Sequence, residues 1–98
     1  MAFKLIVEPE AQKEIDEAFD YFKRVSDDIK VLVNLYDEID NAYSNLKTNP
    51  FFQVRRKHYR ALPLKNYPYL LFFEVLEKEK IVKVLSFFNT LQDHNKWP

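Results

Sequence analysis

Cationic residues gather in one short stretch of this sequence, and side chains able to carry protons stand among them or just after them. The cations are Arg55, Arg56, Lys57, Arg60 and Lys65, with His58 among them and Tyr67 and Tyr69 following. Lysine and arginine neutralise the charge of a phosphate group, whereas histidine and tyrosine can donate or accept protons. The stretch therefore favours contact with a phosphate backbone or with an acidic protein partner.

Each of these residues also has a purely structural interpretation. The run from Arg55 to Lys57 is more typical of a solvated loop than of a site. Arg60 lies in an expected strand, where pairing with an acid of the helices is as good an interpretation as function. A histidine such as His58 is more often a surface or packed residue than a catalyst, and Tyr69 fits a core position better than a catalytic one.

The charge of the chain divides between its two halves. Residues 1–50 hold 6 Lys/Arg and 11 Asp/Glu, a net charge of −5, whereas residues 51–98 hold 9 and 4, a net charge of +5. This asymmetry indicates a basic surface on one side of the fold. It is equally consistent with an acidic helical layer that covers a basic sheet, because a summed charge does not locate a surface.

Several residue types are missing, and their absence excludes whole classes of chemistry. The 98 residues include no glycine and no cysteine, and the two histidines, His58 and His94, lie far apart. Glycine-rich phosphate loops, disulfides and cysteine-based zinc sites are therefore excluded, and neither a metal nor another cofactor is expected. Any left-handed backbone position is expected to fall to Asn or Asp. No apolar run approaches the ~20 residues that span a bilayer, so a cytoplasmic protein without membrane contact is expected.

The first half of the chain predicts a strand and two helices. Alternating apolar residues indicate a strand over Ala2–Val7. Pro9 suits a first helical position, and the apolar spacing behind it predicts an amphipathic helix to about Arg24. Ser26 is the expected N-cap of a second helix, which Pro50 ends. The short link between them implies an antiparallel helical hairpin.

The second half predicts β structure. Strands are expected over Tyr59–Leu64, Tyr69–Leu76 and Ile81–Phe88, with a turn at residues 77–80. Because these strands carry large apolar residues on both faces, both faces need a cover, which the helices, the C-terminal tail or a partner would supply. The fold class is therefore α+β in one domain of residues 1–98: an N-terminal strand, an antiparallel helical hairpin and a three-stranded antiparallel sheet, in the order β-α-α-β-β-β.

Four segments together resemble the RelE/ParE superfamily of toxins. Glu8-Pro9-Glu10-Ala11 after a short strand is similar to the family's opening, and Asn49-Pro50-Phe51 to the end of its second helix. Arg60 followed by the aromatic-rich Tyr67–Val75 resembles its basic residue and central strand. The segment Asp93–Trp97 is similar to its C-terminal ending. The resemblance covers essentially the whole chain, in order, and is more specific for the family than for an activity.

The resemblance implies the toxin of a type II toxin–antitoxin pair, a plasmid stabilisation protein neutralised by a cognate antitoxin whose C-terminal segment wraps the toxin. It implies one of two targets. ParE-like members inhibit DNA gyrase by binding, whereas RelE-like members cut mRNA on the ribosome without a metal. A third alternative is a detoxified domain that only binds its antitoxin. The assemblies it suggests are a homodimer or a heterotetramer with the antitoxin.

If the chain is an enzyme, the resemblance implies a metal-independent mRNA endoribonuclease with Arg60, Lys65 and His58 as catalytic residues. Lys65 stands closest to a family arginine before the central strand. Asn89 occupies the usual histidine position, and asparagine cannot shuttle a proton at neutral pH, which favours the gyrase-binding alternative. Residues expected to contact the target are Arg55, Arg56, Lys57, Asn89, Gln92, Lys96 and Trp97. A turn at the end of a strand is an equally good interpretation of Asn89, and an anchor of the tail on the sheet is the preferred interpretation of Trp97.

Overall fold

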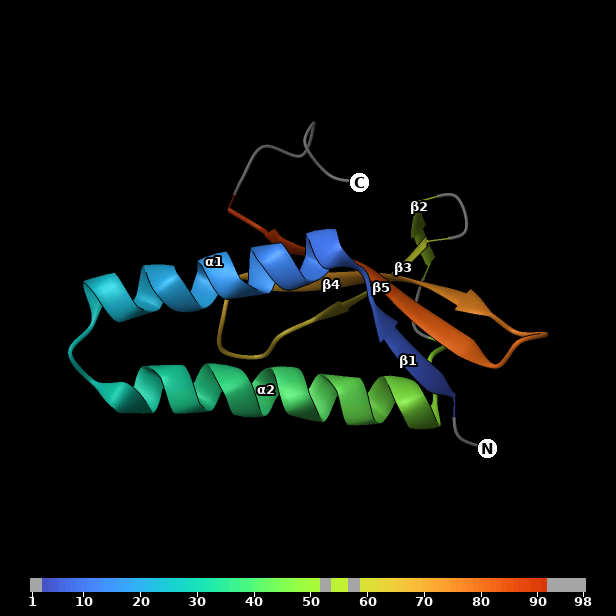
Figure 1. Cartoon of the computed structure of the whole chain (residues 1–98), viewed down its shortest axis with the longest axis horizontal. Helices are drawn as coiled ribbons and strands as arrows, with labels where there is room; N and C mark the ends of the chain where they lie inside the picture. Colours follow the sequence, from blue (N-terminus) through green and yellow to red (C-terminus); the bar gives the residue numbers. More distant parts are fainter. Residues whose placement is uncertain (1–2, 52–53, 57–58, 92–98) are drawn as a thin grey trace.

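Two helices lie side by side on one face of a five-stranded sheet (Figure 1). The computed structural model describes residues 3–51, 54–56 and 59–91, the middle range by its backbone alone. The elements along the chain are β1 (Lys4–Val7), α1 (Pro9–Val25), α2 (Ile29–Thr48), β2 (Val54–Arg56), β3 (Tyr59–Pro63), β4 (Tyr69–Leu76) and β5 (Ile81–Asn89). The predicted α+β fold and the β-α-α-β-β-β order are confirmed, with the short β2 added before β3.

The sheet is mixed, because the N-terminal strand, whose pairing the sequence left open, joins the three predicted antiparallel strands in parallel. Its strand order is β1-β5-β4-β3-β2. β3, β4 and β5 pair antiparallel as predicted, but β1 pairs parallel to β5, from Lys4 opposite Ile81 to Val7 opposite Val84. The chain leaves β1 through the helical hairpin, re-enters the sheet as β2 at the opposite edge, and reaches the place beside β1 only as β5, after β3 and β4. A long crossover of this kind allows two strands to pair in parallel.

The helix ends follow local capping chemistry, with one correction to the prediction. Pro9 is in the first turn of α1, as expected. Ser26, however, caps the C-terminus of α1, and the N-cap of α2 is Asp28, whose side chain accepts a hydrogen bond from the Lys30 N–H at 2.9 Å. Ser26 Oγ instead accepts the N–H of Asp28 at 3.2 Å, so the serine supports the cap from outside the helix.

The turn between β4 and β5 contains a left-handed residue that is neither Asn nor Asp. Lys80 has φ 56°, and its N–H reaches the Glu77 carbonyl at 3.3 Å. Lys80 is the last residue of this four-residue turn, and its backbone directs the chain into β5. Its ammonium lies 5.5 Å from the centre of the Phe3 ring. The expectation that such positions would fall to Asn or Asp is therefore wrong here.

The buried residues form two clusters, one on each face of the sheet. The larger packs the inner sides of both helices, including Ile15, Leu35 and Leu46, against Phe73 and Val84 of the strands. The smaller, on the other face, consists of Ala61, Leu70, Phe72 and Phe88. The two apolar sheet faces that the sequence predicted are thus both buried. Within the described residues, no helix is long and apolar enough to cross a membrane.

Candidate functional site

The two cationic candidates whose side chains the structure describes lie near opposite ends of β3. Arg60 lies in β3 opposite Phe73, and its guanidinium carbon is 5.4 Å from the centre of the Phe51 ring. Lys65 follows the other end of β3, where its backbone N–H donates to Glu38 Oε1 at 2.8 Å. At the rise of an extended strand, five residues place their Cα atoms up to about 16 Å apart.

Asn89 has a structural role at the end of β5. It pairs with Tyr69 of β4, and its Oδ1 accepts a hydrogen bond from the Leu91 N–H at 2.9 Å. The amide therefore closes a turn after the strand, which was one of its two interpretations from sequence. Asn89 also lines a groove, so its remaining donor can still reach a partner bound there.

The other predicted contact residues cannot be placed. Lys57, His58, Gln92, Lys96 and Trp97 lie outside the described residues. Arg55 and Arg56 belong to β2, on the edge of the sheet, but only their backbone is described. No group of three or more potential metal ligands comes together in the described part of the chain.

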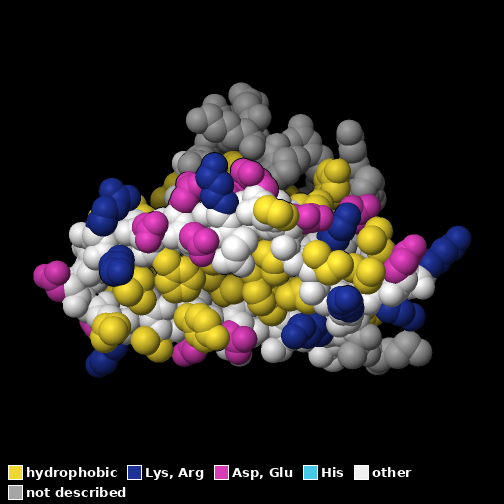
Figure 2. Space-filling model, viewed as in Figure 1, with side chains coloured by type: hydrophobic (Ala, Val, Ile, Leu, Met, Phe, Trp, Pro, Cys, Tyr) yellow, Lys and Arg dark blue, Asp and Glu magenta, His cyan; other side chains and the backbone are white. Residues whose placement is uncertain are grey.

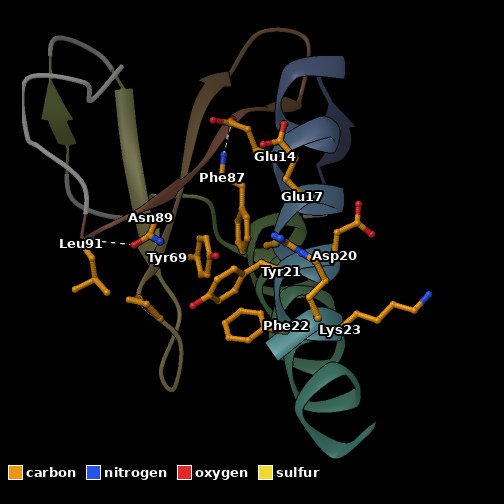
Figure 3. A pocket seen from close by; sticks show the side chains of 13 residues that line it. Glu14, Glu17, Asp20, Tyr21, Phe22, Lys23, Tyr69, Phe87, Asn89 and Leu91 are labelled. Atoms are coloured by element: carbon orange, nitrogen blue, oxygen red, sulfur yellow. Dashed lines mark hydrogen bonds between the residues drawn. The ribbon is translucent and has the colours of Figure 1, made fainter. Parts of the chain in front are cut away.

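A groove of about 840 Å³ lies between α1 and the ends of β4 and β5 (Figure 3). The helix and the two strand ends, which are far apart in the sequence, form its walls. Its lining residues are Glu14, Glu17, Ala18, Asp20, Tyr21, Phe22, Lys23, Arg24, Pro68, Tyr69, Phe87, Asn89 and Leu91. Tyr21 is 48% exposed and Leu91 is 81% exposed, so the groove offers apolar surface to a partner.

Aromatic rings form the floor of the groove. Tyr69 and Phe87 stack with their ring centres 4.4 Å apart and almost parallel. Phe22 meets Tyr69 edge-on at 6.4 Å and Tyr21 at 5.2 Å. Each pair adds roughly 0.5–1.5 kcal/mol beyond simple burial. Tyr69 and Phe87 are themselves buried, so the apolar surface open to a partner comes from the exposed Tyr21 and Leu91.

Charged side chains form the rim of the groove on the α1 side. Glu14, Glu17 and Asp20 carry negative charge, and Lys23 and Arg24 carry positive charge nearer the end of the helix. Glu14 accepts hydrogen bonds from Ser86 Oγ at 3.0 Å and from the Phe87 N–H at 3.1 Å. Because β1 pairs with β5 only as far as Val84, this carboxylate satisfies an amide beyond the last strand pair.

Two ionisable groups of the groove, Glu14 and Tyr69, have pKa values raised toward their neutral forms. Burial raises the pKa of Glu14 above its ordinary value of 4.5; the hydrogen bonds from Phe87 and Ser86 oppose the shift, and Glu10 and Glu17 add to it. Burial, with a contribution from Tyr21, likewise raises the pKa of Tyr69 above 10.0. A phenol with a raised pKa stays protonated at neutral pH.

Sequence reasoning missed this groove and the part that Tyr21 and Leu91 have in it. Neither Tyr21 nor Phe22 was among the residues expected to contact a partner. The available signal was Tyr21 itself, a large aromatic residue next to the apolar stripe, in a segment otherwise rich in acids. Its partners from β4 and β5 are more than 40 residues away, so local periodicity could not reveal them.

Comparison with known proteins identifies the class of this fold. The fold matches a chain described as the chromosomal ParDE TA system from P. aeruginosa, with a TM-score of 0.74 and 18% identity over 90% of this chain and 96% of that one. At this identity the match shows a common fold. A search of curated protein sequences found no match.

The superfamily predicted from sequence, that of the RelE/ParE toxins, is confirmed. The family model described as the ParE toxin of the type II toxin–antitoxin system parDE matches residues 5–94. The match includes both helices and all five strands. The chain belongs to the ParE toxin family.

Proposed function

We propose that this chain is the toxin of a type II toxin–antitoxin pair and that it acts by binding a protein target, for which DNA gyrase is the family precedent. The observation that carries the proposal is the family match over residues 5–94. The separation of Arg60 and Lys65 along β3 supports binding over catalysis, because RNA cleavage needs charge stabilisation and proton transfer at one phosphate.

The groove is the proposed docking site for the cognate antitoxin. The exposed side chains of Tyr21 and Leu91 suit apolar anchors of a partner, and the carboxylates of Glu17 and Asp20 suit a neighbouring lysine or arginine. An amphipathic antitoxin segment with apolar anchors on one side would fill it, which is a common mode of peptide recognition. Such a partner would also cover Leu91, which is 81% exposed in the free chain.

The test is to produce the chain alone and with the product of the adjacent reading frame, and to measure growth, gyrase supercoiling and translation. We expect growth arrest by the chain alone, relief by the neighbouring product, and inhibition of supercoiling by the purified chain. An antitoxin that restores growth without binding the chain would count against a type II pair. Supercoiling unchanged at micromolar excess of toxin would remove gyrase as the target.

The ribonuclease alternative rests on the basic second half of the chain. It predicts cuts within codons in a translation extract, lost in the Arg60→Ala, Lys65→Ala double variant. A chain that is folded yet harmless on its own would instead indicate a domain retained only for binding its antitoxin. The same experiment therefore separates all three alternatives.

A further inference from the structure

The first turns of α2 expose a row of large apolar side chains. Ile29, Val33 and Tyr36 are 71%, 50% and 61% exposed. Their spacing of four and then three residues places them on the same side of the helix. These three residues are called the hairpin patch below. Figure 2 shows hydrophobic side chains gathered in the space between α1 and α2 and over the first half of α2.

The hairpin patch takes no part in the core. α2 buries Leu35, Ile39, Ala42 and Leu46 against the sheet, and the patch lies on a different side of the same helix. None of its residues lines the groove beside α1. Three large apolar side chains within eight residues therefore stay in water, although the fold needs none of them there. Contiguous apolar surface of this kind marks an interaction site.

Acidic side chains surround the hairpin patch. Residues 20–40 hold six Asp/Glu and three Lys/Arg, a net charge of −3. Asp27 precedes the patch, whereas Asp37 and Asp40 follow on the next turn, and all three are exposed. This charge disfavours nucleic acids and anionic membranes. It favours a polypeptide that presents apolar residues together with lysine or arginine.

We propose that the hairpin patch is the surface through which the toxin binds its protein target, by docking a cationic amphipathic helix of that target. This rests on the proposed function as a binding toxin and names a second surface for it. Apolar side chains of the target helix would lie against Val33 and Tyr36, and its basic residues would meet Asp37 and Asp40. The spacing of the patch along α2 is the one that helix-to-helix recognition uses.

The decisive variant is Val33→Ser with Tyr36→Ser, which removes apolar surface without emptying the core. We expect it to lose growth arrest and to bind DNA gyrase at least about tenfold more weakly than the wild type. Its affinity for the antitoxin should stay within about twofold. Asn34→Ser, an exposed change on the same helix, is the matched control. Circular dichroism and thermal unfolding establish that each variant is folded.

A charge variant tests the acidic surround separately. Asp37→Asn with Asp40→Asn should slow gyrase association and weaken its dependence on salt, because long-range attraction acts mainly on the association rate. Association that is unchanged in rate and salt dependence would contradict a cationic occupant.

Other outcomes identify other occupants and overturn the proposal. A Val33→Ser, Tyr36→Ser variant as toxic as the wild type shows that the patch does not bind the target. Loss of antitoxin binding would assign the patch to the antitoxin. If light scattering shows that the wild type is a dimer and the variant a monomer, the hairpin patch binds a second copy of the chain. A wild type that neither arrests growth nor binds gyrase refutes the proposed function itself, and with it the target as occupant.

Discussion

At the scale of single residues, Glu14 links helix α1 to the part of β5 that lies beyond its pairing with β1. Its carboxylate accepts hydrogen bonds from Ser86 and Phe87 while burial raises its pKa. Since the protonated form is favoured in the folded state, the folded pKa lies above the unfolded one. The associated stability is therefore fully present below the unfolded pKa and is lost as the pH rises through the folded pKa.

Glu14→Gln should remove this pH dependence while keeping an oxygen that accepts hydrogen bonds from Ser86 and Phe87. We expect the free energy of unfolding of the wild type, relative to this variant, to increase as the pH falls from 7 to 4. Denaturant unfolding across this range measures it. Asp20→Asn, at an exposed acid of the same helix that does not contribute to the pKa of Glu14, is the control. The same pH profile for both variants would contradict a particular role for Glu14.

At the scale of elements, α2 holds the loop between β3 and β4 in place. Glu38 accepts hydrogen bonds from the N–H groups of Lys65 and Asn66 at 2.8 and 3.1 Å, and from Asn66 Nδ2 at 2.8 Å. About two turns earlier on α2, the Val31 carbonyl accepts a hydrogen bond from the Tyr67 hydroxyl at 2.6 Å. Four hydrogen bonds thus position the loop that leads into Tyr69 and the floor of the groove.

Glu38→Ala should loosen this loop. We expect a loss of roughly 1–3 kcal/mol in the free energy of unfolding, because three donors lose a charged acceptor in a partly exposed setting. Faster amide exchange at Lys65 and Asn66 would locate the change. Asp37→Ala, at an exposed acid one residue away, should change the free energy of unfolding by no more than about 0.5 kcal/mol. It should leave amide exchange at Lys65 and Asn66 unchanged. Equal effects of the two substitutions would show that the hydrogen bonds to Glu38 contribute little.

At the scale of the whole molecule, two candidate surfaces share one end of the helical hairpin. The groove includes Tyr21 to Arg24, near the end of α1, and the hairpin patch begins at Ile29, at the start of α2. Only the short link at residues 26–28 separates these two parts of the chain. An antitoxin bound in the groove and extending past this link would block the target from reaching the hairpin patch. The antitoxin would then neutralise the toxin although the two partners bind different surfaces.

A groove variant should therefore behave in the opposite way from the patch variant. Tyr21→Ser with Leu91→Ser removes exposed apolar surface from the groove, so we expect antitoxin affinity to fall at least about tenfold while growth arrest persists. Cells producing both proteins would then stop growing. The Val33→Ser, Tyr36→Ser variant serves as the reciprocal control. Unchanged antitoxin affinity would exclude the groove as the docking site.

The sequence alone determined the class of this protein and most of its elements. The helical spacing behind Pro9, the span Tyr69–Leu76 and the turn at residues 77–80 all agree with the structure, because each depends on neighbours within a few positions. Membership of the RelE/ParE superfamily was likewise visible from segments distributed along the whole chain.

The tertiary structure decided which distant segments meet. The parallel pairing of β1 with β5 and the groove floor of Tyr69 and Phe87 both follow from how the strands are ordered in the sheet. Strand order is set by packing between residues far apart in the chain, and local periodicity carries no record of it. The side of a helix that stays exposed, as with Val33 and Tyr36, is likewise known only once the core has formed.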